Sequence, residues 1–506
     1  MNSTFAAFFR SPNNIKQTAT VLSFIILGSL FLFRVALIFS YVPEITGMDN
    51  NFVHTVIRLL TGLSPYPAPE GFPYAGNIYT PLYFNICHLL GIATGADPEY
   101  PIQVYQVCRT VALLCDILSV FLLFRILIRK IAIDKSFALL SVALYSCLIC
   151  YLAYTFSRVD CLFLTFYISV FYLLTKKEQT FTYRQILLVS ILSVCCVFSK
   201  QNGIILPFLV STWLFFTNYK QKIIAFLFSY TICFTVFYLF YTQVMGYTHL
   251  VTFAVKGLNN QIDPSWFYIN IFKPLANSII ILPLCAGLVI TIGLLLNRKT
   301  NFTTALSVVY LIQLMFSTGA AFKWGSSLGY FYENLALSLI LITEYRSLNN
   351  FTQNSQSRLY WFASPLLIIF FIHVLLQDYL FFINQRSQRI AEYKQQEEVK
   401  YYLRSRLNGR YVLDLYNPNR DFFKNFLYKE IAVPHFDAID CCLLPDKTFD
   451  YTRLKEDFIN GNIKYIIFPK DAALPSIWNV SLAHYQKDTS IYNFDLYHFR
   501  PDVKKH

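Results

Sequence analysis

Long apolar stretches, separated by short polar turns, fill the first three quarters of the chain. A helix needs about 20 largely apolar residues to cross a bilayer, and fewer where neighbouring helices surround it. Eleven stretches fit this description, at residues 21–42, 106–127, 136–156, 161–175, 185–199, 203–217, 223–243, 276–296, 304–321, 331–343 and 360–383. The pattern therefore predicts a mainly α-helical, polytopic membrane bundle with about 11 transmembrane helices over residues 1–383.

Residues 43–105, between the first two predicted spans, have a different pattern. Their apolar piece, residues 79–93, is short and bounded by proline. Such a piece is typical of a helix that lies in the membrane interface rather than one that crosses the bilayer. We expect an outer loop with interfacial helices.

The pattern changes again after residue 383. A charged helical stretch at 385–407 precedes two strand-like runs, 410–414 and 464–469, and a helix-like run at 452–460 lies between the strands. Strand, helix and strand in this order predict a small α/β domain at residues 384–506. This region contains no glycine-rich phosphate loop, so the sequence assigns it no chemistry of its own.

Composition excludes an ordinary soluble protein. Charged residues make up 14% of the chain and hydrophobic residues 55%, whereas soluble domains carry about 25% charged residues. An aromatic content of 18% also excludes a disordered chain. Ten of the twelve cysteines fall in or beside apolar stretches, and the adjacent pair Cys441 and Cys442 lacks metal-ligand spacing. No disulfide framework or cysteine metal site is therefore predicted.

Basic residues indicate the orientation, because they accumulate in the cytoplasmic loops of membrane proteins. With the N-terminus in the cytoplasm, fifteen Lys and Arg residues fall on the inner side of the bundle and seven on the outer side. This asymmetry predicts an odd number of spans and an extracytoplasmic C-terminal domain. The abundance of lysine, asparagine and isoleucine is typical of a low-GC genome and favours a bacterial origin. With the predicted topology, this places the chain in a bacterial inner membrane and the C-terminal domain in the periplasm.

Three basic residues depart from the charge rule in parallel positions. Arg158, Lys200 and Lys323 each lie in a short polar turn at the outer end of a predicted span. A single residue of this kind often extends to the lipid headgroups. Three on the same face of the bundle favour a shared anionic ligand.

Asp49 follows the first predicted span. An isolated carboxylate in this position is commonly a solvated helix N-cap. The sequence continues with Gly-Leu-Ser-Pro-Tyr at 62–66 and Ile-Tyr-Thr-Pro-Leu-Tyr at 78–83, which are turn-forming and fold the loop back onto the membrane surface. A carboxylate held at that interface is positioned to take a proton from an acceptor hydroxyl.

These motifs, in this order, resemble those of GT-C superfamily glycosyltransferases, in particular bacterial relatives of the protein O-mannosyltransferase and aminoarabinose-transferase group. The similar segments are Asp49 with the two turns after it, Cys108-Arg109, Ser157-Arg158-Val159-Asp160, Ser199-Lys200-Gln201-Asn202-Gly203, Lys323-Trp324-Gly325-Ser326 and Tyr330-Phe331-Tyr332-Glu333. The resemblance extends from Asp49 to Glu333. The C-terminal region resembles the small extracytoplasmic domain of these proteins.

The resemblance implies an integral-membrane glycosyltransferase of cell-envelope biogenesis, which moves a sugar from a polyprenyl-phosphate carrier to an acceptor hydroxyl on the extracytoplasmic side. Asp49 would be the base of an inverting transfer, and Arg158, Lys200 and Lys323 would bind the donor phosphate. The expected supporting residues are Arg109, Asp160, Gln201, Tyr330 and Glu333, with Asp160 paired to a neighbouring cation. The expected partners are the lipid-linked donor, a glycolipid, glycan or protein acceptor, and membrane lipids, without nucleic acid.

Two positions depart from the family pattern. Asn50 and Asn51 follow Asp49 where the family has an acidic neighbour, so a D-x-D metal site is not expected. We therefore predict no obligatory metal or other cofactor, with a divalent metal as the alternative. Gly329 replaces the asparagine expected before Tyr330, which affects the expected contacts to sugar or acceptor.

Two other functions fit parts of the pattern. A polytopic transporter or lipid flippase would also be basic and rich in aromatic residues. Transporters, however, place their substrate-binding charges near the bilayer midplane, at broken helices related by repeats. A GT-C-like glycan polymerase or ligase shares the membrane pattern and would differ in product length. The position of the polar motifs at the outer ends of spans favours the transferase.

Overall fold

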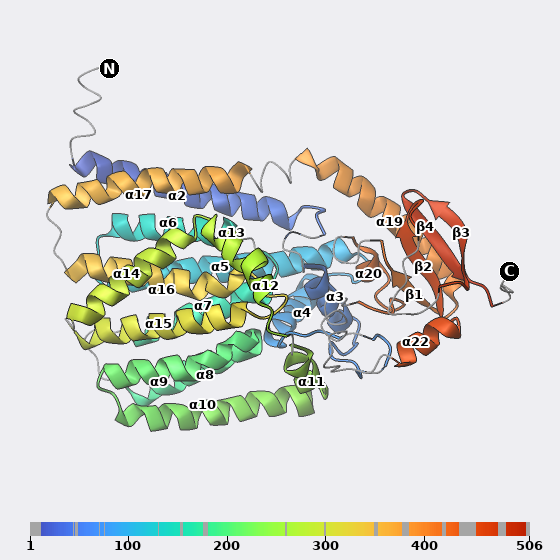
Figure 1. Cartoon of the computed structure of the whole chain (residues 1–506), viewed down its shortest axis with the longest axis horizontal. Helices are drawn as coiled ribbons and strands as arrows, with labels where there is room; N and C mark the ends of the chain where they lie inside the picture. Colours follow the sequence, from blue (N-terminus) through green and yellow to red (C-terminus); the bar gives the residue numbers. More distant parts are fainter. Residues whose placement is uncertain are drawn as a thin grey trace, which may run out of the picture. The chain divides into compact units, whose positions relative to one another are not determined.

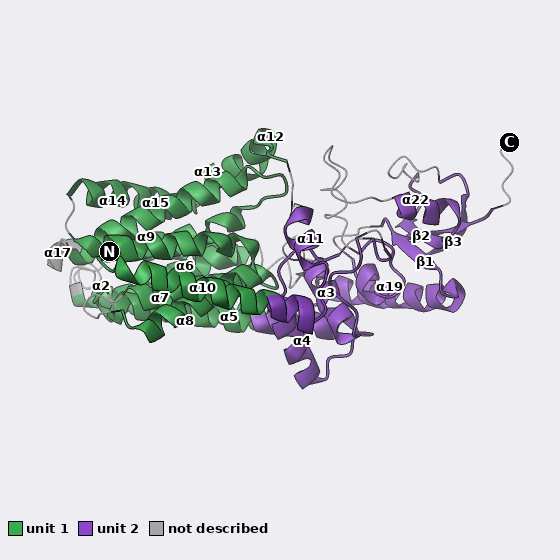
Figure 2. Cartoon of the chain, turned by 90° about the horizontal axis from the view of Figure 1, so that it is seen from below, with its two compact units in different colours: residues 1–37, 112–238, 261–381 green, residues 38–111, 239–260, 382–506 purple. Residues whose placement is uncertain are grey.

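The structure is a computed structural model of the chain. It describes residues 12–43, 45, 49–69, 71–74, 76–129, 131–151, 155–175, 181–258, 261–297, 300–348, 353–376, 384–416, 421–434, 452–473 and 482–501. The pair Cys441 and Cys442 lies outside the described residues. The chain forms two compact units, coloured separately in Figure 2. The first contains residues 1–37, 112–238 and 261–381, and the second contains residues 38–111, 239–260 and 382–506.

Each of the eleven predicted apolar stretches coincides with a helix. These helices are α2 (Pro12–Ile38), α5 (Pro101–Arg129), α6 (Lys135–Tyr151), α7 (Val159–Leu174), α8 (Tyr183–Ser199), α9 (Leu206–Phe216), α10 (Gln221–Leu239), α14 (Ile281–Asn297), α15 (Asn301–Ala321), α16 (Tyr332–Leu348) and α17 (Gln353–Val374). In the first unit they lie side by side (Figure 1), with direct packing of α7 on α8, α9 on α15, α14 on α16 and α6 on α17. The mainly helical bundle is thus confirmed.

Four described helices are long and apolar enough to cross a membrane by themselves. They cover Asn13–Ile38, Pro101–Arg129, Gln221–Val244 and Asn301–Ala321. The segments Pro264–Ala276 and Ile281–Asn297, which meet at 87°, would add a fifth span if they cross together. Several other apolar helices, including α6, α7 and α8, have 17 residues or fewer and need neighbouring helices around them. The number of spans therefore stays a prediction.

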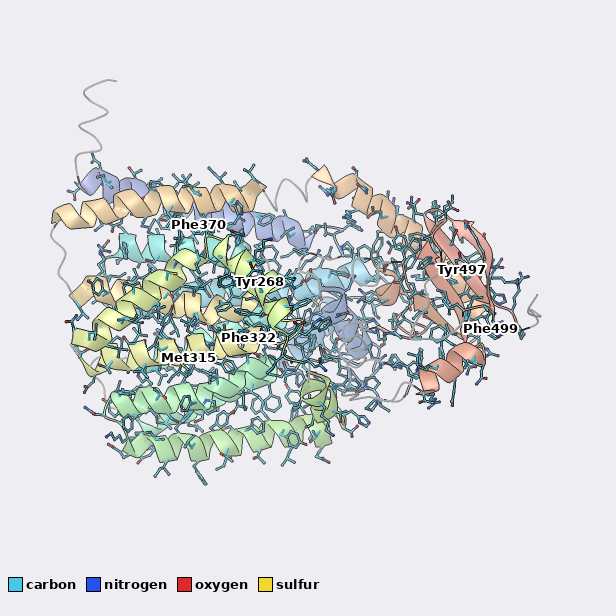
Figure 3. All side chains as sticks on the ribbon, viewed as in Figure 1. Tyr268, Met315, Phe322, Phe370, Tyr497 and Phe499 are labelled. Carbon is cyan, nitrogen blue, oxygen red and sulfur yellow. The ribbon has the colours of Figure 1, made fainter. Side chains whose placement is uncertain are left out.

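The helices of the first unit bury aromatic residues inside and expose apolar ones outside. Tyr145, Tyr167 and Trp213 are fully buried, whereas Ile224 and Met315 are 78% and 74% exposed. Met315 is labelled on α15 in Figure 3. A helix that packs against other helices on one side and faces lipid on the other is expected to carry apolar side chains on both sides. Two short connecting helices, α12 (Pro264–Trp266) and α13 (Lys273–Ala276), belong to the same unit.

The second unit joins the predicted outer loop to the C-terminal region. Its loop helices are α3 (Asp49–Leu60) and α4 (Leu82–Thr94), and α4 corresponds to the short apolar piece predicted as an interfacial helix. Another short helix, α11 (Leu250–Ala254), belongs to this unit. The C-terminal helices are α19 (Arg386–Leu407), α20 (Phe423–Phe426) and α22 (Thr452–Ile459).

A four-stranded mixed sheet forms the centre of the C-terminal region. Its strands are β1 (Tyr411–Asp414), β2 (Ile463–Pro469), β3 (Tyr485–Ile491) and β4 (Phe494–Phe499), in the order β1-β2-β4-β3. β1 and β2 are parallel, as the predicted strand–helix–strand order requires, and the other pairs are antiparallel. The sequence analysis found β1, α22 and β2 but not the hairpin of β3 and β4.

Alternate residues of the strands pack into two separate cores. Leu413 and Ile466 join Phe458 of α22 and Tyr74 of the loop. Their neighbours Val412 and Ile467 instead join Val399 and Leu403 of α19 and Phe423 of α20. This alternation follows from the two-residue period of a strand. Tyr497 and Phe499, labelled in Figure 3, pack against the core that contains α22.

Candidate functional site

The first turn of α7 brings two of the predicted site residues together. Arg158 is the N-cap of α7 and has an extended backbone, and Asp160 lies two residues further on. The Arg158 Nε atom is 3.3 Å from Asp160 Oδ2. Both residues are buried, with 6% and 3% exposure. The sequence predicted that Asp160 pairs with a cation, and this pairing is confirmed.

Lys200 reaches the same carboxylate from the end of α8. Its Nζ donates a hydrogen bond of 2.6 Å to Asp160 Oδ1. Lys200 lies in an extended conformation between α8 and the 3-10 turn Gln201–Ile205. Gly203 allows this turn to fold back, because a Cβ there would lie 2.5 Å from the backbone nitrogen of Val197. Gln201 begins the turn directly after Lys200.

Two residues near the start of α16 complete this group. The Lys200 ammonium lies 4.8 Å from the ring centroid of Tyr330, a cation–π distance. Glu333 is 2% exposed and interacts electrostatically with both Lys200 and Asp160. We call Arg158, Asp160, Lys200, Tyr330 and Glu333 the cation cluster.

Some buried polar atoms in and beside the cation cluster can still form hydrogen bonds to a ligand. Arg158 and Lys200 share one carboxylate, Asp160, and buried charges are stable only when they are paired and hydrogen-bonded. Among the described residues, Glu333 Oε2 has no hydrogen-bond partner. The adjacent Asn334 is fully buried, and neither atom of its amide has a partner in the described part of the chain. Buried polar groups in this condition are expected to bind water or ligand hydroxyls.

Lys323 lies in the turn that follows α15, in the same unit as the cation cluster. Its backbone forms an isolated bridge with Ile262, after the end of α15. Gly325 has φ +79°, a left-handed conformation that glycine adopts without strain, and this closes the turn. The rings of Trp266 and Trp324, with centroids 5.2 Å apart, pack the turn against the preceding segment. Phe322 and Tyr268, from these two segments, are labelled in Figure 3.

Asp49 belongs to the second unit, where it begins helix α3. It is fully buried rather than solvated, and its Oδ2 accepts a hydrogen bond of 2.9 Å from the backbone nitrogen of Ile45. Arg109, also in this unit and 2% exposed, donates hydrogen bonds to the backbone oxygens of Ser40 and Val42. Arg109 therefore fixes the backbone at residues 40–42, directly after α2.

Sequence reasoning missed the polar contacts between α3 and α20. Asn50 and Asn51, interpreted only as departures from a metal motif, bond to residues of the C-terminal region. The sequence separation in the first of these contacts is 371 residues. The one available signal was a polar Lys424-Asn425 pair inside an otherwise aromatic run, Phe422 to Phe426.

The described side chains around Asp49 do not form a typical metal-binding set. In the ranges of the chain that the structure describes, no three His, Cys, Asp or Glu side chains gather as metal ligands. The position after Asp49 that would hold a D-x-D carboxylate carries Asn51, whose amide oxygen faces the ammonium of Lys424. The donor set around Asp49 therefore differs from the oxygen-rich carboxylate sets that hard divalent cations prefer.

Solved structures show the fold to which this chain is similar. ArnT from Cupriavidus metallidurans bound to undecaprenyl phosphate superposes with a TM-score of 0.61 and 10% sequence identity, over 94% of this chain and 97% of that chain. The archaeal oligosaccharyltransferase AglB from Archaeoglobus fulgidus, in complex with an inhibitory peptide and a dolichol-phosphate, gives a TM-score of 0.51 and 12% identity, over 88% of this chain and 69% of that chain. The chain thus shares the fold of these two structures, which both belong to GT-C membrane glycosyltransferases and define the GT-C fold as the term is used below.

This GT-C fold includes the C-terminal region, since the likeness to ArnT covers nearly the whole of both chains. No protein-family model and no curated protein matches the sequence. The likeness that the motifs predicted is thus confirmed at the level of the fold.

Proposed function

We propose that this chain is an integral-membrane glycosyltransferase that moves a sugar from a polyprenyl-phosphate carrier to an acceptor hydroxyl. The observation that carries the proposal is the buried cation cluster, in which Arg158 and Lys200 share Asp160 within a GT-C fold. The similar structures contain undecaprenyl phosphate and dolichol-phosphate, which are both lipid phosphates. This chemistry supports a polyprenyl phosphate as the ligand of the cluster.

In the proposed reaction, the cluster stabilises the leaving group. As the bond between the anomeric carbon and the phosphate oxygen breaks, negative charge accumulates on the departing polyprenyl phosphate. Arg158 offers two parallel N–H donors and Lys200 a point charge, so together they bind a phosphate by geometry and by charge. Asp160 holds both cations before the donor arrives, which is the preorganisation that electrostatic catalysis requires. Lys323 stays in the proposal as a third phosphate ligand.

Asp49 is the proposed general base. It takes the proton of the acceptor hydroxyl as the oxygen attacks the anomeric carbon, and the transfer inverts the configuration at that carbon. Its burial and its bond from Ile45 fix the carboxylate in one orientation, which favours proton transfer along a defined direction. Glu333 and Asn334 are the proposed contacts for sugar hydroxyls, because both carry unfilled hydrogen-bonding capacity.

An apolar cavity in the first unit is the proposed site for the isoprenoid tail. It has a volume of about 420 Å³ and is lined by residues of α2, α5 and α6, including Leu27, Phe31 and Val120. Phe31, one of the lining residues, is 45% exposed, so part of the cavity wall also lies at the surface of the unit. A polyprenyl chain, which is wholly hydrocarbon, matches this lining in polarity.

The proposal also includes an orientation. The N-terminus is in the cytoplasm, and the site and the C-terminal region are on the extracytoplasmic side of a bacterial inner membrane, as the positive-inside asymmetry predicts. The acceptor is a glycolipid, a glycan or a protein. Comparative glycolipid mass spectrometry of a deletion strain would identify the missing sugar and its acceptor together.

Substitution of the proposed base tests the function. Asp49→Asn is expected to abolish sugar transfer in proteoliposomes supplied with polyprenyl-phosphate sugars, while binding of the donor stays close to that of the wild type. The measurement is transfer of radiolabelled sugar to a lipid extract of acceptors. Asp471→Asn, an exposed carboxylate with 76% side-chain exposure, is the matched control and should retain full turnover. Turnover by Asp49→Asn would remove Asp49 from the mechanism.

A further inference from the structure

Helix α3, which begins with Asp49, is almost entirely buried. All residues from Asp49 to Leu59 are buried, although the helix contains five polar or charged side chains in its first seven positions. Such a helix needs partners for its polar groups, because a buried polar group without a hydrogen bond costs about 1–3 kcal/mol. For three of them, Asn50, Asn51 and His54, these partners come from residues 421–425 of the C-terminal region, which run into α20.

The contacts join the first turns of α3 to Asp421, just before α20, and to two residues of α20. Asn50 donates a 2.7 Å hydrogen bond to the backbone oxygen of Asp421 and accepts one of 3.1 Å from Asn425. Lys424 Nζ donates to Asn51 Oδ1 at 2.5 Å. The Nδ1 atom of His54 lies 3.1 Å from the backbone oxygen of Lys424. Three residues of the first α3 turns are thus bound to a five-residue stretch, 421–425.

The other side of α20 is fixed by apolar packing. Phe423 packs against Phe494 of β4, with ring centroids 4.8 Å apart. Phe422 packs against Tyr393 of α19 at 4.8 Å, and its backbone nitrogen donates to Gln396 at 2.7 Å. The sheet and α19 therefore hold α20 in place, while Lys424 and Asn425 present their polar groups to α3.

We infer that Lys424 and Asn425 are positioning residues for Asp49, and that the C-terminal region takes part in the reaction by holding the first turn of α3. This inference rests on the proposed function, in which Asp49 is the base. It also gives a physical reason for Asn50 and Asn51, which are both buried. Their amide groups connect the residue next to the carboxylate to α20. Asn51 in particular needs an acceptor oxygen there, because it faces an ammonium group.

The charged ammonium of Lys424 should hold Asn51 more strongly than a neutral donor would. Lys424 is 2% exposed, and hydrogen bonds to charged groups are about twice as strong as neutral ones. Removal of this bond leaves the first turn of α3 held by Asn50 and His54. A carboxylate displaced by about 1 Å from a productive geometry loses about 100-fold in rate. The loss is expected in kcat rather than in the KM for the donor, since α20 contributes no proposed donor contact.

The test compares Lys424→Met, Asn51→Leu and the double variant in the reconstituted full-length chain. Each single substitution is expected to lower kcat about 10- to 100-fold, with less than about a threefold change in donor KM. The double variant should lose no more than the worse single variant, because both substitutions break the same contact. Lys429→Met, an exposed lysine in the same segment, is the matched control and should keep wild-type kcat.

Two further variants separate position from folding and from the base itself. Asn51→Asp keeps an acceptor for Lys424 and is expected to retain most of the wild-type kcat, even if Lys424→Met lowers the folded yield. Asp49→Asn is measured in parallel. If Asp49→Asn is inactive while the folded variants Lys424→Met and Asn51→Leu have wild-type kcat, the positioning inference is overturned and the base assignment stands. The same conclusion follows if the losses in kcat of the two single variants multiply in the double variant. Turnover by Asp49→Asn overturns both.

Discussion

Asp160 illustrates how one residue organises a charged site. Arg158 and Lys200 come from different helices, and each would be costly to bury without a counter-charge. The shared carboxylate gives both cations a fixed position. The pairing was predictable because Arg158 and Asp160 lie two residues apart at a helix start, where their side chains can meet. The partnership of Asp160 with Lys200 required the packing of α7 on α8, which the sequence alone does not specify.

Asp414 and Asp421 form a second charged feature, at the C-terminal end of β1 and just before α20. Burial raises the pKa of Asp414 to about 6, although a hydrogen bond from Asp421 opposes this shift. Burial and the adjacent Asp414 charge raise the pKa of Asp421 well above its usual value. The two carboxyl groups therefore titrate together and hold a proton at pH values where an exposed aspartate has lost it.

This pair predicts a pH dependence of stability. A carboxyl group with a folded pKa near 6 and an unfolded pKa near 4 stabilises the fold fully below about pH 4, and the contribution is lost as pH rises through about 6. Asp414→Asn removes this ionisation and is expected to raise the unfolding free energy at pH 8 by on the order of 1–3 kcal/mol. Thermal unfolding of the detergent-solubilised protein at pH 5 and pH 8 measures the effect. An equal melting temperature of variant and wild type at pH 8 would contradict it.

At the scale of elements, apolar length predicted helices well. All eleven stretches coincide with helices, because a long continuous apolar sequence favours a helix in this setting. The starts of α8 and α15 also carry sequence signals, since Thr182 with Gln185 and Thr300 with Thr303 form capping boxes. The β3–β4 hairpin was missed because β3, Tyr-Gln-Lys-Asp-Thr-Ser-Ile, is mostly polar and lacks strict alternation.

Other features at this scale were beyond sequence reasoning. The cavity between α2, α5 and α6 depends on how three helices pack, and its wall contains a buried ion pair between Arg34 and Asp116. Thr155 adds a 2.9 Å hydrogen bond to the same carboxylate. No sequence signal identifies Arg34 or Thr155 as a partner of Asp116.

The cavity gives a prediction for the donor tail. Val120→Trp places a larger side chain on a partly exposed part of the cavity wall and is expected to weaken binding of long-chain polyprenyl phosphates about 10-fold, equivalent to about 1.4 kcal/mol. Short-chain carriers, which fill less of the cavity, should lose less. Leu118→Trp, on the exposed surface of the same helix and outside the cavity lining, is the control. Equal affinities of Val120→Trp and wild type for the long-chain carrier would place the tail elsewhere.

At the scale of the whole molecule, the sequence divided the chain at residue 383, whereas the structure groups residues 38–111 with the C-terminal region as one compact unit. Contacts such as Glu99 with Arg404 and Asn50 with Asp421 join parts of the chain that are more than 300 residues apart. Composition shows where the apolar part of the chain ends. It does not show that the loop at residues 38–111 packs with the C-terminal region. The membrane class and the GT-C likeness were predictable, since both depend on the order of local features along the chain.

The central claim is that this GT-C chain binds a lipid phosphate through its cation cluster. The most direct measurement is the affinity of the full-length protein in nanodiscs for undecaprenyl phosphate and for undecaprenol, which differ only in the phosphate. We expect undecaprenyl phosphate to bind more tightly, and Lys200→Met to weaken its binding about 10- to 100-fold. Lys222→Met, which changes a lysine in the first turn of α10, should have no effect. Equal affinity for the two lipids, or an unchanged affinity of Lys200→Met for the phosphate, would contradict the account.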